Sequence, residues 1–115
     1  MRDQQALLDR IFHGLADPTR MLLVERLCLG SASVSDLARP LAMSLSAVMQ
    51  HLDVLEACDI VRSEKVGRVR TCHVETRALR TAQHWISDLH DFRASRTGTA
   101  VSAYTLVRLV DGRRD

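Results

Sequence analysis

The sequence contains no apolar run that approaches the roughly twenty residues needed to span a bilayer. No signal-peptide pattern opens the chain, so we expect a cytoplasmic protein with no membrane partner. Repeats, low-complexity tracts and long linkers are also missing, and a chain of 115 residues suits one domain over 1–115. The formal net charge is only +2. Affinity for a polyanion would therefore depend on local clusters of cations rather than on overall charge.

Catalytic patterns are missing as well. The sequence offers no nucleophile paired with a general base, no phosphate-binding glycine loop and no carboxylate pair in an apolar pocket. We therefore predict neither an enzyme nor a bound cofactor. The three cysteines, Cys28, Cys58 and Cys72, form no Cys-x-Cys or Cys-x-x-Cys pair and are expected to be reduced in the cytoplasm. Cys28 has apolar neighbours, which favours a buried position as a small hydrophobic residue.

The segment MSLSAVMQHLDVLEACDIV predicts a helix over 45–58. Its apolar residues Val48, Leu52 and Leu55 recur at helical spacing, so one face would be anchored in a core. Small and hydrogen-bonding side chains occupy the other face, as a base-reading helix requires, and Gln50 can bond both edge atoms of an adenine. An ordinary amphipathic surface helix is the alternative for this segment taken alone. The residues expected to contact DNA from this segment are Ser44, Ser46, Ala47, Met49, Gln50 and His51.

Two shorter helices are predicted before this one. Asp17-Pro18 forms a helix start, and Gly30 suits the left-handed residue that ends that helix. Ser33 begins the next helix, VSDLARPLA, with an acidic residue at near capping-box spacing. A tight turn of about three residues at 42–44 would then complete a helix-turn-helix over about 34–58.

The residues after the third of these helices predict a β-hairpin over about 60–75. Two β-rich runs, roughly 60–66 and 69–75, meet at Gly67-Arg68. From residue 60 to residue 80 the chain has six basic residues, Arg62, Lys65, Arg68, Arg70, Arg77 and Arg80, against two acidic residues, Glu64 and Glu75. Such a strip suits phosphates. The cations expected to contact the DNA backbone are Lys65, Arg68 and Arg70, together with Arg39.

Taken together, these segments resemble the ArsR/SmtB family of bacterial winged-helix repressors from about Leu8 to Phe92. The resemblance is carried by LADPTR at 15–20, VSDLA at 34–38, Ser46-Ala47-Val48, His51-Leu52, Val54-Leu55-Glu56 and Gly67-Arg68. It implies a mainly α winged helix-turn-helix fold in the order α-α-α-α-β-β-α, with the hairpin as the wing. It also implies a homodimer that binds an inverted-repeat operator in double-stranded DNA and represses its operon until an inducer or metal releases it.

Apolar stripes at both ends of the predicted domain suit dimerisation. Helices are expected over about 4–15 and 76–97, and the resemblance implies that they pair across a two-fold axis. Two base-reading helices would then meet successive major-groove faces, about 34–36 Å apart. Packing of both stripes within one protomer is the alternative. Gly98 is expected to end the last long helix, and 101–110 to add a short apolar helix without an assigned role. The expected dimer residues are Leu8, Ile11, Phe12, Leu79, Trp85, Ile86, Leu89 and Phe92.

The chain departs from the family pattern in ways that bear on DNA binding. Gln50 stands where Lys or Arg is frequent, and Asp59 stands where Gly ends the helix, although Asp can adopt left-handed geometry. No Lys or Arg occurs over 44–58, whereas Asp53 and Glu56 are acidic. Phosphate binding must therefore come from other segments. The acidic helix also supports an alternative function, a winged-helix protein-interaction module without specific DNA binding.

No effector site is complete in the sequence, and the effector stays unassigned. The arsenic-type cysteine pair is absent from VSDLA, and Cys58 matches only the second of two cysteines found in some cadmium and lead sensors. Asp88 and His90 match half of a zinc- or nickel-type site, with His84 on the same face, but no histidine follows them. We therefore assign no metal ligand. A metal-responsive sensor using these three residues, or a thiol-responsive one using Cys58 or Cys72, is an alternative. The sequence does not predict the operator, the regulated genes, the sign of regulation or a role for residues 98–115.

Overall fold

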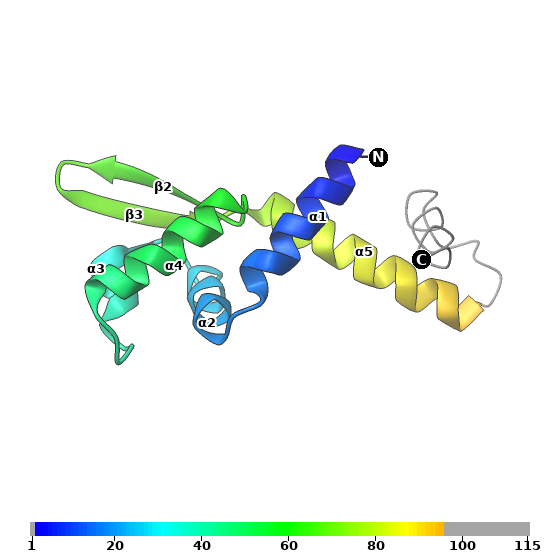
Figure 1. Cartoon of the computed structure of the whole chain (residues 1–115), viewed down its shortest axis with the longest axis horizontal. Helices are drawn as coiled ribbons and strands as arrows, with labels where there is room; N and C mark the ends of the chain where they lie inside the picture. Colours follow the sequence, from blue (N-terminus) through cyan, green and yellow to red (C-terminus); the bar gives the residue numbers. More distant parts are fainter. Residues whose placement is uncertain (1, 96–115) are drawn as a thin grey trace.

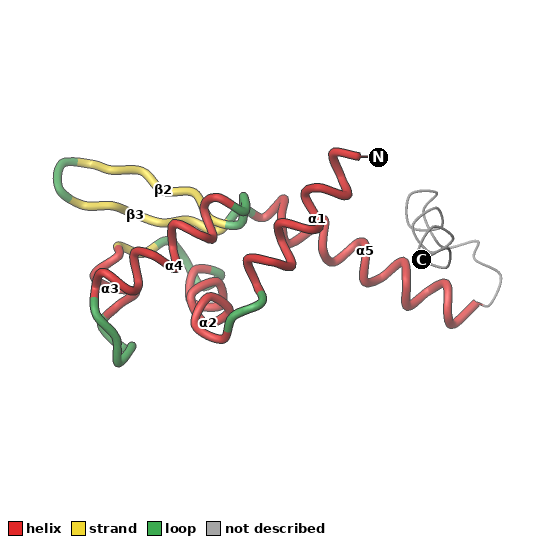
Figure 2. The backbone as a smooth tube through the Cα atoms, viewed as in Figure 1, coloured by secondary structure: helices red, strands yellow, loops and turns green. Residues whose placement is uncertain are grey.

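The computed structural model describes residues 2–95, so the predictions for Gly98 and for 101–110 lie outside the described residues. The elements follow one another as α1 (Arg2–Leu15), α2 (Pro18–Leu27), β1 (Ala32–Ser33), α3 (Val34–Ala38), α4 (Leu45–Ala57), β2 (Val61–Val66), β3 (Val69–Val74) and α5 (Thr76–Ser95). Figures 1 and 2 show β2 and β3 as a long hairpin beside α4, with α5 extending away from the other elements. This order confirms the predicted winged helix-turn-helix, with one added strand, β1.

β2 and β3 form the antiparallel hairpin that the sequence predicts. The register pairs Val61 with Val74 and ends with Val66 opposite Val69, so a two-residue turn joins the strands. Gly67 lies in this turn at φ 64°, a backbone conformation that favours glycine.

The short strand β1 was not predicted. It pairs antiparallel with β3, with Ala32 opposite Cys72 and Ser33 opposite Thr71, and the sheet order is β1-β3-β2. A strand of two residues has no periodicity that a sequence pattern could reveal. Its pairing ties the start of α3 to the sheet.

Side-chain caps begin the helices where they were predicted. At the start of α2, the Asp17 carboxylate accepts a hydrogen bond from the backbone N–H of Arg20 at 2.9 Å. Ser33 caps α3, and Ser44 caps α4 by accepting from the N–H of Ala47 at 3.1 Å. Each cap satisfies a backbone donor that the first helical turn leaves without an intrahelical partner.

The third helix is shorter than predicted. α3 ends at Ala38 instead of continuing through VSDLARPLA, so residues 39–44 connect it to α4. Pro40 explains this difference, because it has no N–H to donate within a helix and its ring clashes with a preceding carbonyl group. The predicted turn of about three residues was therefore wrong in length, although the helix-turn-helix order holds.

α4 ends in a turn that brings Asp59 into the left-handed region, at φ 62°. The N–H of Ile60 donates to the carbonyl of Leu55 at 3.0 Å, and the N–H of Asp59 donates to the carbonyl of Glu56 at 3.1 Å. These two bonds form a Schellman motif, which usually has glycine at the left-handed position. Asp59 thus takes the place of the usual glycine, and Asp is among the residues that can adopt this geometry.

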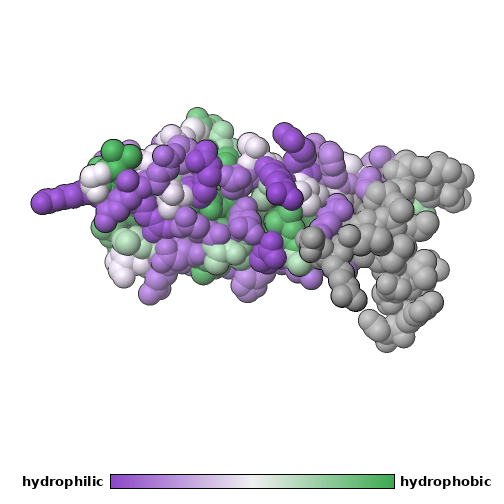
Figure 3. Space-filling model, turned by 90° about the horizontal axis from the view of Figure 1, so that it is seen from above, coloured by the Kyte–Doolittle hydropathy of each residue, from purple (hydrophilic) through white to green (hydrophobic). Residues whose placement is uncertain are grey.

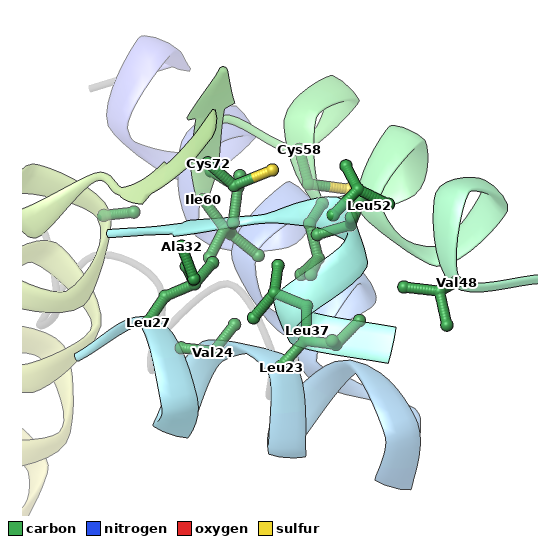
Figure 4. Packing of buried hydrophobic residues seen from close by; sticks show 14 of the residues in the cluster. Leu23, Val24, Leu27, Ala32, Leu37, Val48, Leu52, Cys58, Ile60 and Cys72 are labelled. Atoms are coloured by element: carbon green, nitrogen blue, oxygen red, sulfur yellow. The ribbon is translucent and has the colours of Figure 1, made fainter. Parts of the chain in front are cut away.

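The core holds α4 by one face. Val48, Leu52 and Leu55, the predicted apolar stripe, are fully buried. Figure 4 shows labelled side chains from α2, β1, α3 and α4 converging with Ile60 and Cys72. The opposite face of α4 is left for other contacts. Among residues 2–95, none of the helices combines the length and the apolar character needed to cross a membrane.

Candidate nucleic-acid interface

The face of α4 opposite the core presents small and polar side chains. Ser46 and Gln50 are exposed, Met49 is 40% exposed and Ala47 is half-buried. The hydroxyl of Ser44 is engaged in capping the helix. An exposed amide such as that of Gln50 can bond two edge atoms of an adenine, and apolar side chains can contact a thymine methyl group. This face therefore has the chemistry that base recognition in a major groove requires.

His51 was also predicted to contact DNA, but it lies against the start of α2. Its Nδ1 is 3.8 Å from Oδ2 of Asp17 and 3.5 Å from Nη1 of Arg20, and its side chain is 23% exposed. Arg20 in turn donates from Nε to the carbonyl of Gly14 at 2.7 Å. These contacts give His51 a role in joining α2 to α4, so we leave it out of the proposed DNA-contacting set.

A groove of about 490 Å³ separates the first half of α4 from the wing, the hairpin formed by β2 and β3. Leu45, Met49 and Val69 expose apolar surface there. Seen from above in Figure 3, small apolar areas lie among hydrophilic ones at the end where the wing turns. Apolar surface next to cations can accept sugars and base methyl groups beside phosphates. The groove is lined by Ser33, Val34, Ser35, Leu45, Met49, Lys65, Arg68, Val69 and Arg70.

Two cations of the wing are available for phosphates. Lys65 and Arg68 are exposed, and within residues 2–95 no carboxylate forms an ion pair with either. Arg39, after α3, is also exposed, with Nη2 3.1 Å from Oδ1 of Asp36. Ion pairs this exposed contribute little, so Arg39 can exchange that carboxylate for a phosphate.

Arg70 is placed differently from the other predicted phosphate ligands. Its Nη1 lies 3.1 Å from Oδ1 of Asp53 and its Nη2 lies 2.7 Å from Oε2 of Glu56, and its side chain is 20% exposed. Partial burial opposes the charged state, yet the hydrogen bond to Asp53 raises the pKa of Arg70 above its ordinary value. The guanidinium is therefore occupied within the protomer, and both acidic side chains of α4 have a partner.

The outer face of the wing is also largely neutralised. Nε of Arg62 lies 2.7 Å from Oε1 of Glu75, and Nη1 of Arg62 lies 3.5 Å from Oε1 of Glu64. Nε2 of His73 is 3.1 Å from the same oxygen of Glu64. Because side chains alternate along a strand, Arg62 and Glu64 lie on the opposite face from Lys65. A count of basic residues along the sequence thus overstates the positive charge of this strip.

The predicted dimer residues divide into two groups. Leu8 and Ile11 are fully buried in the protomer core, so they support α1 from within and expose nothing to a partner. Phe12 and Ile86 are exposed, and the rings of Phe12 and Trp85 meet edge to face with centroids 5.3 Å apart. The half-buried members on α5 are Leu79, Trp85, Leu89 and Phe92.

The cysteines differ from one another in exposure. Cys58 and Cys72 are buried, and burial raises the pKa of the Cys72 thiol, which opposes formation of a reactive thiolate. Cys28 is exposed, and the expectation of burial was wrong. It stands at the C-cap of α2, where the apolar stripe of the helix ends and the chain turns through the exposed residues Leu29 and Gly30.

The residues considered for a metal site lie on α5. His84 and His90 are exposed, and Asp88 is half-buried. Within the part of the chain that the structure describes, no group of three or more His, Cys, Asp or Glu side chains is arranged to hold a metal ion. One protomer therefore adds no support to the metal-responsive alternative.

Comparison with known proteins finds relatives that share this region. Residues 17–63 match the model of the family described as bacterial regulatory protein, arsR family. An HTH-type transcriptional regulator of Mycobacterium tuberculosis is 41% identical over 71 residues, which are 62% of this chain and 66% of that protein. A transcriptional repressor SmtB homolog of Synechocystis sp. is 36% identical over 66 residues, which are 57% of this chain and 50% of that protein. The chain thus spans from half to about two thirds of the length of these curated relatives.

A solved structure extends the similarity to most of the fold. The crystal structure of an ArsR family transcriptional regulator matches with a TM-score of 0.73 and 41% identity, covering 79% of this chain and 94% of that one. These relatives are transcriptional regulators and not enzymes, in agreement with the prediction from sequence. The chain belongs to the ArsR family of bacterial transcriptional regulators.

Proposed function

We propose that the protein is a homodimeric, sequence-specific repressor that binds an inverted-repeat operator in double-stranded DNA. The observation that carries this proposal is the exposed polar face of α4 beside a wing on which Lys65 and Arg68 form no ion pair within residues 2–95. The name of the Synechocystis relative supports repression as the sign of regulation. A cytoplasmic location fits this role.

In this proposal the first half of α4 is the recognition helix and enters the major groove. Gln50 bonds an adenine, Ser46 bonds a neighbouring base, and Met49 contacts a thymine methyl group. Ala47 is small enough to let the helix approach the base edges. Ser44 contributes by holding the start of the helix in place through its cap.

Phosphates are bound from the flanks of this helix. Lys65 and Arg68 reach the backbone from the wing, and Arg39 reaches it from the connection between α3 and α4. Each phosphate contact releases condensed counterions, so the logarithm of affinity falls with the logarithm of salt concentration with a slope of about −0.9 per contact. These residues give affinity and orientation, whereas the base contacts give specificity.

Dimerisation is supported by apolar surface on α1 and α5. Phe12 is 38% exposed and Ile86 is 54% exposed, and both neighbour the half-buried Trp85. A second copy related by a two-fold axis would cover these side chains and present two recognition helices to one face of the duplex. An inverted-repeat operator matches this symmetry.

A protein-interaction module without specific DNA binding is the second candidate. Its main support from sequence was the acidic character of α4. Because Arg70 pairs with both Asp53 and Glu56, the helix does not present two unpaired carboxylates. This observation favours DNA binding over the interaction module.

The test is binding of the full chain to fluorescent duplexes from its own upstream region at several salt concentrations. Gln50→Ala should reduce discrimination against a scrambled duplex by roughly 5- to 150-fold and leave weak salt-dependent binding, since one bidentate base contact is worth about 1–3 kcal/mol. Arg68→Gln should weaken binding to both duplexes and make the slope of log affinity against log salt concentration shallower by about one. Arg26→Gln, at an exposed position near the end of α2 and outside the predicted DNA-contacting and dimer residues, is the matched control and should change neither the discrimination nor the salt dependence.

The outcomes separate the two candidates. If the wild-type protein binds no upstream duplex in a salt-sensitive way, the repressor proposal fails and the interaction module replaces it. If Gln50→Ala keeps full discrimination, Gln50 does not read bases and the assignment of the α4 face has to be revised.

A further inference from the structure

Each nitrogen of the Arg70 guanidinium has a partner, two of them on α4 and the third within the wing. Nη1 lies 3.1 Å from Oδ1 of Asp53, Nη2 lies 2.7 Å from Oε2 of Glu56, and Nε donates to Oγ of Ser63 at 3.0 Å. Ser63 closes the network, because its Oγ donates to Oε1 of Glu56 at 3.0 Å and its backbone N–H donates to the same oxygen at 3.3 Å. One cation thus connects α4, β2 and β3.

This network follows from the spacing of residues in each element. Asp53 and Glu56 are three residues apart on α4, so they share one face. In the hairpin, Lys65 lies directly opposite Arg70, and Ser63, two residues before Lys65, shares their face. The two carboxylates therefore meet the inner face of the wing where the hairpin lies beside α4 (Figure 1).

The charges of the network bear directly on DNA binding. Two unpaired carboxylates on a helix next to a polyanion would repel it. With Arg70 in place, two carboxylates and one guanidinium sum to a single negative charge, spread over several hydrogen bonds. The guanidinium is largely shielded from solvent, so salt screens its attraction to the carboxylates less than it screens an exposed pair.

We propose that Arg70 is a positioning residue for DNA binding, which offsets one of the two negative charges of Asp53 and Glu56 and fixes the wing against the recognition helix without contacting phosphate itself. Lys65 lies opposite it on the same face, forms no ion pair within residues 2–95, and keeps its charge for the DNA backbone. Two neighbouring cations of the wing therefore have different tasks. This inference rests on the proposed DNA-binding function.

The first experiment compares Arg70→Gln with Arg68→Gln in the full chain, using the same upstream duplex over a series of salt concentrations. Arg68→Gln should make the slope of log affinity against log salt concentration shallower by about one, as loss of a phosphate contact requires. Arg70→Gln should weaken binding by roughly tenfold at low salt, because two carboxylates are left facing the DNA, without lowering the slope in this way. A slope that is shallower by about one in Arg70→Gln would overturn the proposal.

A rescue experiment tests the role of the carboxylates. Adding Asp53→Asn and Glu56→Gln to Arg70→Gln should restore most of the lost affinity, because no unpaired charge is then left on α4. Failure of this triple variant to recover affinity would overturn the proposal. If Arg70→Gln alone does not fold, the double variant Asp53→Asn with Glu56→Gln replaces it. That variant releases Arg70 toward the DNA and should steepen the salt slope by about one, whereas an unchanged slope would overturn the proposal.

Hydrogen exchange of the free protein separates this inference from the proposed function. Arg70→Gln should raise amide exchange in β2 and β3 above the wild-type rate, and Arg68→Gln should not, because Arg70 pairs with Asp53 and Glu56 of α4 whereas Arg68 forms no ion pair within residues 2–95. Equal protection of the wing in both variants would show that Arg70 does not hold the wing against α4, even if the protein binds DNA. If the wild-type protein binds no DNA, the proposed function fails. Increased exchange in Arg70→Gln but not in Arg68→Gln would still show that Arg70 holds the wing against α4.

Discussion

His51 of α4 lies against Asp17, the cap of α2, with its Nδ1 3.8 Å from Oδ2 of the carboxylate. The same oxygen accepts the hydrogen bond from the backbone N–H of Arg20 at 2.9 Å. That hydrogen bond, more than the charge of His51, holds the pKa of Asp17 below its ordinary value, against the opposing effect of desolvation. One carboxylate therefore couples the start of α2 to α4.

Asp17→Asn keeps an oxygen that can cap α2 but removes the negative charge. Because the pKa of Asp17 is lower in the folded than in the unfolded chain, its charge stabilises the fold above the unfolded pKa, and this contribution is lost as the pH falls through the folded pKa. We expect the variant to be less stable than wild type at neutral pH, with the difference disappearing as the pH falls well below 3.8, the ordinary value. Urea unfolding followed by circular dichroism over this pH range measures it. Asp9→Asn, at an exposed position of α1, is the control, and a difference that stays constant with pH would contradict the assignment.

Gly14 of α1 is buried against Cys58 and Ile60, in the connection between α4 and β2. A Cβ at this position would lie 2.5 Å from Cδ1 of Ile60 and 3.1 Å from Cβ of Cys58. Overpacking of this kind costs about 1–3 kcal/mol. Alanine improves helix propensity over glycine by at most about 1 kcal/mol, and less near a helix end. We expect Gly14→Ala to lower the free energy of unfolding by about 1–2 kcal/mol, measured by urea unfolding.

The close contact can be isolated by a second substitution. Ile60→Val removes Cδ1 and should cost about 0.5–1.5 kcal/mol by itself. In the Gly14→Ala background it should cost less, since it also relieves the clash. Strictly additive effects of the two substitutions would show that they do not meet in the folded protein.

α4 and the wing could be predicted because each carries its own local pattern. Val48, Leu52 and Leu55 mark the buried face of α4 by their helical spacing, and Gly67 marks the turn of the hairpin. The early end of α3 could also have been foreseen, since Pro40 cannot continue a helix. These features depend on residues that are close together in the chain.

The ion pairs of Arg70 could not be predicted in the same way. A count of basic residues treats Arg70 and Arg68 alike, although one is enclosed by carboxylates and the other forms no ion pair within residues 2–95. The difference depends on how the hairpin packs against α4, and no local sequence pattern encodes that packing. The same holds for His51, whose partner Asp17 belongs to another helix, and for the groove beside Val69.

Asp59 combines an unfavourable backbone conformation with an exposed ion pair. Its φ is 62°, and Nη2 of Arg10 lies 2.9 Å from its Oδ2, with both side chains largely exposed. Such a pair contributes about 0–1 kcal/mol, whereas relief of left-handed geometry by glycine is worth roughly 1 kcal/mol. We expect Asp59→Gly to match or exceed the wild type in thermal stability. Asp59→Ala loses the pair and keeps the strain, so it should be less stable than Asp59→Gly by about 1 kcal/mol or more. Equal stability of the two variants would contradict the strain at this position.

Thiol reactivity should follow burial. Cys28 is exposed, whereas Cys58 and Cys72 are buried, and burial raises the pKa of Cys72. We expect one thiol per chain to react rapidly with Ellman's reagent in native buffer, and the other two to react only after denaturation. Cys28→Ser should abolish the rapid phase. Rapid reaction of a second thiol in the folded protein would reopen the thiol-responsive alternative.

Ile86 offers the sharpest test of the proposed dimer. It is 54% exposed on α5, so an isolated protomer tolerates a charge there. In the dimer the second copy would cover that charge and leave it buried and unpaired. We expect Ile86→Glu to be monomeric in sedimentation velocity and to bind operator DNA more weakly, because its two recognition helices are no longer joined. His84→Glu introduces the same charge change two residues earlier, on the opposite side of the helix, and should stay dimeric. If the wild-type protein is monomeric, or if Ile86→Glu stays dimeric with unchanged affinity, the dimer interface does not lie on this face. The apolar stripes of α1 and α5 would then serve packing within one protomer.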